Sequence, residues 1–395
     1  MQLLLPVYLP TLLIAISDGM MATVLPLYAR GAGFSYGLVG VILAGEAIGM
    51  LLTDIPAGTL LRRIDRKVVM IAGGLALAVT AAALVLTEAA WGMLVLRVLA
   101  GVGAGLFNVS RHAYLAENAS SHGRGRAIAI FGGVNRIGVF VGPLLAGTVA
   151  SRAGLSLPFA LCAGFSVASV ISVIVFARRG ESEHSPNDST RESARRHLAK
   201  VAYDNRTLLA TAGLAQLCAQ GVRAGRKVVI PLVASSVLEL DVAAVGWILS
   251  LSALVDMSLF YPAGWLMDNF GRKYAIVPCF LIQSIGMLLV PLSTGFGTLL
   301  AAACLIGFGN GLGSGTMMTL GADLAPKASL GEFLGVWRLI GDGGGVISPL
   351  IIGTIADALT LGAGTIVIAC VGLVGTSLFA FSVPETNRRT PASVP

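Results

Sequence analysis

The chain has 395 residues and a formal net charge of +7; 55% of its residues are hydrophobic and only 12% are charged. Apolar runs of about 20 residues, the length that crosses a bilayer, recur along the whole chain. This composition excludes a soluble protein, and the positive charge therefore does not indicate a nucleic-acid partner. It indicates a protein that crosses a lipid bilayer many times.

Taken in chain order, the hydropathy pattern predicts twelve transmembrane helices. We expect the first six at residues 6–28, 38–60, 68–88, 91–113, 127–149 and 156–178. The second six are expected at 207–233, 242–266, 274–292, 296–320, 333–357 and 361–383. The polar segment 179–206 separates the two sets. The predicted domains are an N-terminal six-helix bundle (1–178), a cytoplasmic linker (179–206) and a C-terminal six-helix bundle (207–395).

The basic residues predict the orientation of these spans. With the N-terminus in the cytoplasm, 18 of the 27 Lys and Arg residues fall in cytoplasmic segments, and only Arg30 and Arg152 lie on the other side. Cytoplasmic loops carry such an excess. We therefore expect both termini in the cytoplasm and, from the short loops, a location in the cell (inner) membrane. The five cysteines lie in apolar runs without CxxC spacing, so no metal site is expected.

An internal repeat relates the two bundles. A shift of 206 residues brings Pro56-Ala57-Gly58 onto Pro262-Ala263-Gly264 and Arg66-Lys67 onto Arg272-Lys273. The same shift matches three glycines of the fourth span, at 101, 103 and 105, with those at 307, 309 and 311. The repeat predicts two pseudo-symmetric halves around an axis along the membrane normal.

With twelve spans and this repeat, the segment GWLMDNFGRK at 264–273 resembles the loop signature of the major facilitator superfamily (MFS) of transporters. Gly264 permits close helix contact and Gly271 a turn with positive φ, while Asp268 can pair with Arg272 and Lys273. The resemblance covers nearly the whole chain. It implies an all-α integral membrane protein with the MFS fold, in which the loop aspartate latches the cytoplasmic gate against the eleventh helix.

The first copy of this loop, GTLLRRIDRK at 58–67, departs from the signature. It shares Gly58, Arg66 and Lys67 with the second copy, but Arg62 stands where the second copy has Asp268. A cation is unfavourable at a helix N-terminus. Two interpretations remain open: Asp65 supplies the missing carboxylate, or Arg62 pairs with Glu332 at the start of the eleventh helix and closes the gate with reversed polarity. Asp54, at the end of the second helix, is assigned to the same gate.

Ionisable residues inside the predicted spans are candidates for function, because a charge within a bilayer is costly. Asp18, Glu46 and Asp256 are candidate proton carriers, since desolvation favours the neutral form of a carboxyl group. Arg97 lies in LRVLAGVGAG, which resembles the fourth-helix signature of the superfamily, whose arginine is linked to proton coupling. The alternative for each of these residues is a structural role in hydrogen bonding or anchoring.

Arg136 and Asp342 occupy equivalent repeat positions, each about ten residues and therefore about 15 Å into its span. In the superfamily, the fifth helix contacts the C-terminal half and the eleventh contacts the N-terminal half. The two charges are thus expected to flank the central interface at matched depth. Arg338 stands four residues before Asp342 and shares its helix face. A purely structural ion pair is the alternative.

The fifth span reads GGVNRIGVFVGPLLAG. Gly138, Gly142, Pro143 and Gly147 resemble the signature of antiporters in the superfamily. Glycines four residues apart make a smooth face for close packing, and proline can bend the helix. Generic membrane packing is the alternative interpretation.

The leading functional hypothesis is a secondary active transporter that exports a small, amphipathic organic substrate by proton antiport and alternating access. It needs no cofactor other than the coupling proton, and is expected to act as a monomer in the lipid bilayer. The alternative is uptake or exchange of an anionic metabolite, because seven bases and five acids lie within the spans. A membrane enzyme or a channel is disfavoured, since the chain shows no metal-ligand spacing, catalytic constellation or selectivity filter.

Overall fold

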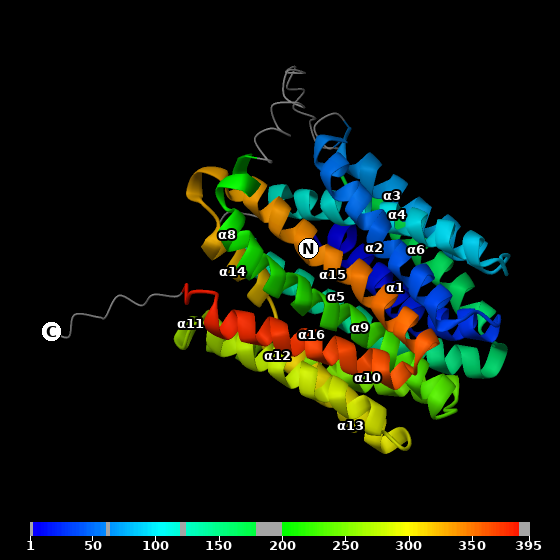
Figure 1. Ribbon diagram of the computed structural model, residues 1–395. Coiled ribbons are helices and arrows are strands. Elements are labelled where there is room, and N and C mark those ends of the chain that lie inside the picture. The colour runs from blue at the N-terminus through cyan, green and yellow to red at the C-terminus, as the bar shows by residue number, and fades with distance from the viewer. Residues whose placement is uncertain (1–2, 61–63, 119–123, 179–199, 387–395) are drawn as a thin grey trace.

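The computed structural model describes residues 3–60, 64–118, 124–178 and 200–386, and every regular element among them is a helix (Figure 1). The N-terminal half contains six long helices. Their bounds are Leu9–Gly31 (α1, entered through a π-helical turn at Leu4–Tyr8), Tyr36–Leu60 (α2), Arg66–Leu84 (α3), Ala90–Asn118 (α4), Arg124–Ala153 (α5) and Ser156–Phe176 (α6).

The C-terminal half has six corresponding segments, but three of them are interrupted. The seventh consists of Arg206–Leu208 (α8), a π-helical turn at Leu209–Gly213, Leu214–Leu232 (α9) and a second π-helical turn at Val233–Val237. The eighth is divided into Val242–Ser258 (α10) and Phe260–Asn269 (α11), and the tenth into Phe296–Leu312 (α13) and Thr316–Leu324 (α14). The ninth, eleventh and twelfth are Arg272–Leu289 (α12), Leu330–Ala358 (α15) and Leu361–Phe381 (α16).

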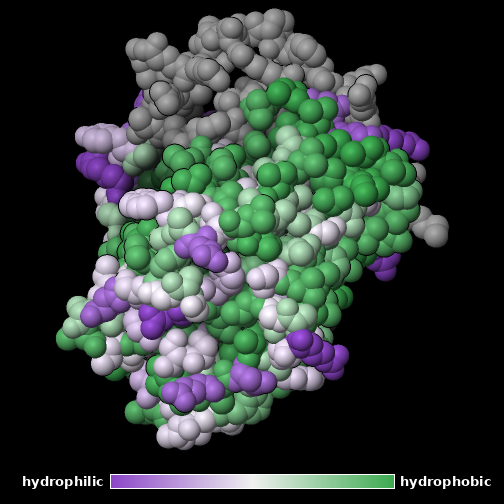
Figure 2. Space-filling view, turned by 90° about the vertical axis from the view of Figure 1, so that its right-hand side faces the viewer, coloured by the Kyte–Doolittle hydropathy of each residue, from purple (hydrophilic) through white to green (hydrophobic). Residues whose placement is uncertain are grey.

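The helices have the surface of a membrane protein. Large apolar side chains are exposed along them, including Val79 and Val175, and Figure 2 shows a broad hydrophobic area with the hydrophilic residues in small groups. Within the described ranges, 11 helical stretches are long and apolar enough to cross a membrane. The seventh predicted span is not among them, since α9 carries Arg223, Arg226 and Lys227. The all-α membrane fold expected from hydropathy is confirmed.

The two halves touch mainly along two helix pairs, α2 with α15 and α5 with α10, and α1 makes smaller contacts with α9 and α10. Glycine makes these approaches possible, because a side chain would collide with the opposing backbone. Gly40 lies against the carbonyl of Pro349, and Gly147 lies against Gly246. Both contacts bring one half directly against the other, and α2 and α15 run side by side in Figure 1.

This inter-half packing is confined to one part of the interface. It runs from mid-helix to the end that carries Tyr36 and Asp357, which we call the closed end. At the opposite end, a Cβ added to any of four glycines of α5 and α15 would meet no atom within 4 Å: Gly132, Gly133, Gly331 and Gly335. The described helices therefore pack together across the interface at the closed end and lose that packing toward the other.

Candidate functional site

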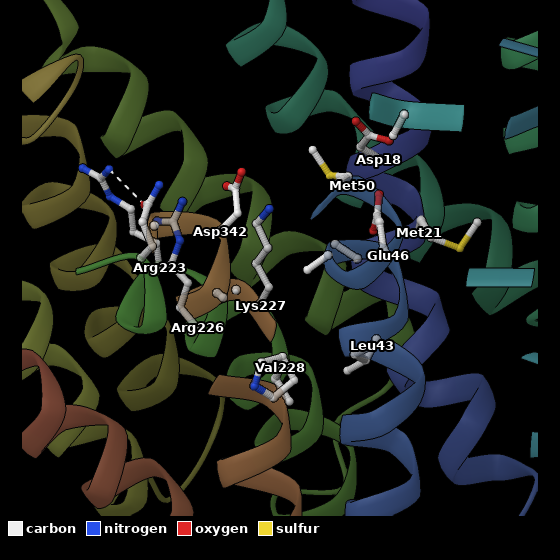
Figure 3. Close-up of a pocket in the computed structure, with 18 of the residues that line it drawn as sticks. Asp18, Met21, Leu43, Glu46, Met50, Arg223, Arg226, Lys227, Val228 and Asp342 are labelled. Carbon is white, nitrogen blue, oxygen red and sulfur yellow. Dashed lines mark hydrogen bonds between the residues drawn. The ribbon is translucent and has the colours of Figure 1, made fainter. Parts of the chain in front are cut away.

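A cavity of about 560 Å³ lies between the two halves and is lined by residues of both (Figure 3). Helices α1 and α2 contribute two carboxylates and a set of apolar side chains to one wall. Helices α9 and α15 contribute the opposite wall, on which cations dominate. The labelled residues of Figure 3 divide accordingly: Asp18, Met21, Leu43, Glu46 and Met50 face Arg223, Arg226, Lys227, Val228 and Asp342.

Asp18 is the exposed carboxylate of the first wall. Its neighbour Gly19 packs so tightly against Gly142 and Pro143 of α5 that a Cβ there would lie 2.9 Å from the proline ring. This contact fixes the rotation of α1 and directs Asp18 toward the cavity, where its side chain is accessible. Among the described residues, no hydrogen bond or ion pair engages the Asp18 carboxylate. It can therefore accept a proton or a cationic group from within the cavity.

Glu46 of α2 differs from Asp18 because it has a fixed partner. Its carboxylate forms a hydrogen-bonded ion pair with Arg97 of α4, whose side chain is buried. Gly45 makes the approach possible, since Arg97 and Leu94 pack directly against it. The pair joins two helices of the same half and still borders the cavity. Glu46 and Arg97, which were both candidates from the sequence, therefore form one ion pair without net charge.

The second wall carries three cations on α9, which the sequence did not place among the principal candidates. Arg223 donates from Nη2 to the carbonyl of Gly313 at 3.0 Å and stacks over Phe280. The same carbonyl also accepts from the Thr316 hydroxyl at 2.8 Å, so Arg223 joins α9 to the break between α13 and α14. Lys227 is exposed to the cavity and forms no hydrogen bond or ion pair with the part of the chain that the structure describes. In the sequence, the segment RAGRK at 223–227 indicates this cluster, because it places three cations within a predicted span.

Asp256 is the centre of a polar network that crosses from one half to the other. Arg136 of α5 donates to Asp256 Oδ1 at 2.7 Å and to Ser314 Oγ at 2.6 Å. Asn310 donates to Asp256 Oδ2 at 2.6 Å, and Arg226 lies 3.6 Å from the same oxygen. Two arginines thus share one nearly buried carboxylate, and the network keeps a surplus positive charge next to the cavity. Ser314 and Asn310 lie in the glycine-rich run GNGLGSG. They were not predicted as site residues, because this run contains no ionisable residue.

Asp342 and Arg338 form a separate pair on α15. The Arg338 Nε atom lies 3.5 Å from Asp342 Oδ2, and the two residues are four apart on one helix face, as their spacing indicated. Asp342 and Arg136 both line the cavity, but the ion pair of Arg136 is with Asp256. Equal depth in the repeat therefore did not decide which charges meet.

The two loop copies form matching contacts. Arg66 pairs with Glu117 as Arg272 pairs with Asp323, at residue numbers that differ by 206. Lys67 donates from Nζ to the carbonyl of Ile174 at 2.7 Å, and Lys273 donates to that of Ala380 at 2.8 Å, again 206 residues on. These bonds tie each loop to the last helix of its own half.

The loops differ in how the following helix is capped. Asp65 caps α3 itself by accepting from the Lys67 N–H at 2.7 Å. At the equivalent position, Gly271 has φ of +123°, and Glu385 accepts from the N–H groups of Arg272 and Lys273 at 2.9 Å. Asp268 is bonded to Arg272 at 3.1 Å.

The remaining gate residues are only partly within reach of the structure. Arg62 lies outside the described residues, as do the side chain of Asp54 and the packing around Gly58, so the pairing of Arg62 with Glu332 stays a prediction. The prediction that Gly264 permits a close helix contact is wrong for this structure, since a Cβ added there would meet no atom within 4 Å. The predicted latch between the first loop and the eleventh helix stays a prediction, because residues 61–63 of that loop lie outside the described residues.

The glycines of the fifth-helix motif divide between two neighbours. Gly138 and Gly142 pack against α1, where Ala15, Ile16 and Gly19 leave room for the backbone. On the next turns, the Pro143 carbonyl and Gly147 meet Gly246 of α10 in the other half. The motif thus holds α1 in place and also forms part of the α5–α10 contact between the halves.

The similarity to known proteins extends along nearly the whole chain. A family model described as Major Facilitator Superfamily matches residues 7–222 and again 212–395. An uncharacterized MFS-type transporter of Methanocaldococcus jannaschii is 23% identical over 89% of this chain and 91% of its own. Multidrug resistance protein MdtH of Klebsiella pneumoniae is 24% identical over 78% of this chain and 74% of its own.

Solved structures show the same fold at low identity. A POT family transporter crystallised with a thioalcohol-conjugated peptide has a TM-score of 0.77 and 14% identity, with 95% of each chain covered. The nucleoside transporter NupG has a TM-score of 0.75 and 12% identity, over 94% of this chain and 98% of its own. At such identities the likeness concerns the arrangement of the helices.

Proposed function

Because the chain belongs to the major facilitator superfamily of transporters, which bind small-molecule substrates within the membrane, we propose that it exports a small amphipathic organic compound by proton antiport. The observation that carries the proposal is Asp18, an accessible carboxylate in the central cavity without a bonded partner among the described residues. A transporter, and not an enzyme, is also what the family implies.

Competition for Asp18 is the basis of the proposed exchange. A carboxylate that is accessible in the cavity can hold either a proton or the charged end of a substrate. Met21, Leu43 and Met50 supply apolar contacts next to it, which suit the hydrocarbon part of an amphipathic molecule. The likeness to MdtH, a multidrug resistance protein by name, supports the same direction of transport.

The test is transport in proteoliposomes that contain a pH-sensitive dye. Amphipathic cations, neutral compounds and organic anions are added in turn, and proton movement is followed. We expect the substrate to trigger proton movement. In Asp18→Asn the rate of proton movement should fall at least about 100-fold, because the amide cannot bind and release a proton near neutral pH. The matched control is Asp241→Asn, which changes an aspartate outside the cavity. Substrate flux without proton movement would refute proton antiport.

Transport of an anion is the second candidate, and the α9 wall favours it. Glu46 neutralises Arg97, and Asp256 offsets only one of its two arginines. Arg223 and Lys227 add further positive charge, so the cavity retains a cationic surplus even when Asp18 is ionised. Arginine and lysine favour carboxylate and phosphate groups.

The sign of the coupling separates the two candidates. A cationic substrate binds better when Asp18 is ionised, so it and the proton displace each other and move in opposite directions. An anionic substrate binds better when Asp18 is neutral, so by reciprocity the two travel together. The dye experiment therefore distinguishes them: the lumen changes pH in opposite senses for the two substrate classes.

We further propose, from the distribution of basic residues, that both termini face the cytoplasm and that the closed end faces the outside. Residence in the cell inner membrane and action as a monomer belong to the same proposal. Reaction of a cysteine introduced at exposed Leu359 with an impermeant reagent, in sealed vesicles of known orientation, tests the orientation.

A further inference from the structure

The closed end carries an inter-half bond that the proposed function does not use. Asp357, on the last turn of α15, accepts from the backbone N–H of Tyr36 through Oδ1 and from that of Gly37 through Oδ2, both at 2.8 Å. Tyr36 and Gly37 form the first turn of α2 in the other half. A single carboxylate thus binds two N–H groups that a helix start leaves without an intrahelical acceptor.

The surrounding residues are shaped for this contact. A Cβ added to Gly37 would lie 2.6 Å from Asp357 Oδ2, and one added to Gly353 would lie 2.5 Å from the Tyr36 carbonyl. Arg30 stacks over the Tyr36 ring at 4.0 Å and donates to the carbonyl of Phe34, which fixes the loop that leads into α2. Each neighbour therefore holds the start of α2 where the carboxylate reaches it.

Comparison of the two repeats shows that the α2–α15 contact has this carboxylate bond and that the equivalent positions of α5 and α10 do not. A shift of 206 places Ser151 at the position of Asp357 and Val242 at that of Tyr36. Ser151 donates to the carbonyl of Thr148 within its own helix, and α10 is capped by its own Asp241, which accepts from the Ala244 N–H at 3.0 Å. At the closed end, glycine packing of Gly147 against Gly246 joins α5 to α10, and the carboxylate of α10 that bonds across to α5, Asp256, lies farther from this end and pairs with Arg136.

We propose that Asp357 is a positioning residue for transport: its carboxylate holds the closed end shut, and the bond must break each time the cavity opens there. The negative charge is attracted to the positive end of α2 only while the halves are together. The inference rests on alternating access between two halves and is independent of proton coupling or substrate charge.

The test measures access to the cavity from each side. Leu43, which lines the cavity, is changed to cysteine in a background whose five cysteines are replaced by alanine and which retains transport. A membrane-impermeant maleimide is applied separately to each face of sealed vesicles. We expect Asp357→Asn to raise the labelling rate from the closed-end face about fivefold, as the attraction of a carboxylate to a helix terminus is lost.

Two further variants make the result decisive. Asp241→Asn removes a carboxylate cap at the same end of the molecule but within one half, and should leave labelling unchanged. Asp357→Glu keeps the charge and should label more slowly than Asp357→Asn. Equal labelling in Asp357→Asn and the parent, or an equal increase in Asp241→Asn, would overturn the proposal. Because no substrate is added, failure of proton antiport would not alter these results.

Discussion

The two halves share one plan but differ where they line the cavity. Helices α2 and α4 of the N-terminal half are continuous, whereas their repeat partners divide into α10 and α11 and into α13 and α14. Gly315, with φ of +75°, marks the second break, and Val109 stands at its equivalent within continuous α4. Non-glycine residues disfavour positive φ, so the N-terminal half could not adopt this break unchanged.

Equivalent cavity positions carry different chemistry. Asp18 corresponds to Ala224, and Met21 corresponds to Lys227, with all four lining the cavity. The Glu46–Arg97 ion pair has its counterpart at the same helix crossing in a hydrogen bond from Ser252 to the carbonyl of Ala303. The comparison teaches that duplication kept the helix crossings and loop anchors while the cavity walls acquired opposite polarity.

The largest expected effect concerns the pair that joins the halves. Arg136→Gln leaves the nearly buried Asp256 with a weaker complement, and should lower the free energy of unfolding by about 2–3 kcal/mol. The repeat-equivalent change, Asp342→Asn, removes a half-exposed pair within one helix and should cost below about 1 kcal/mol. Thermal unfolding in detergent measures both.

The double variant Arg136→Gln/Asp256→Asn serves as the control for this comparison. It removes both charges, so it should be less destabilised than the sum of the single variants. If the single effects simply add, or if Asp342→Asn is as harmful as Arg136→Gln, the network does not distinguish the two halves.

An intermediate effect is expected when cavity chemistry is exchanged between the halves. Lys227→Met gives the second wall the residue of the first, and should weaken binding of organic anions about tenfold by removing an accessible cation. Affinity for cations should stay equal or increase. Binding is measured by substrate protection or calorimetry, with Met21→Leu as the neutral control on the opposite wall. Unchanged anion affinity would remove Lys227 from the site.

The smallest effect concerns the caps of the loop repeat. Asp65→Ala and Glu385→Ala each remove a carboxylate that caps a helix start, and each should cost about 1 kcal/mol of unfolding free energy. Gly271→Asp copies the N-terminal solution into the C-terminal half, but φ of +123° there makes the substitution destabilising. Stabilisation by Gly271→Asp would show that the two caps are interchangeable.

The limits of sequence reasoning follow from particular residues. The range predicted for the eleventh span, 333–357, lies inside α15. It could be predicted because the thickness of the bilayer sets how many consecutive apolar residues a span needs. The partner of Arg136 could not be predicted, since Asp256 and Asp342 are both acids within spans of the other half, and the packing of α5 against α10 decides between them. The break at Gly315 could not be predicted either. The nearby glycines at 307, 309 and 311 match glycines of continuous α4, so a glycine in this region does not by itself indicate a break.

The sequence by itself determined the spans, the duplication and the basic loops, because each depends on the bilayer or on spacing along the chain. The tertiary structure decided which charges meet, which carboxylate stays accessible, and which end is closed by Asp357 against α2. Those outcomes depend on contacts between residues 120 and 321 positions apart, as for Arg136 with Asp256 and Tyr36 with Asp357. Hydropathy places a helix in the membrane, but packing against its neighbours sets its rotation and therefore its partners.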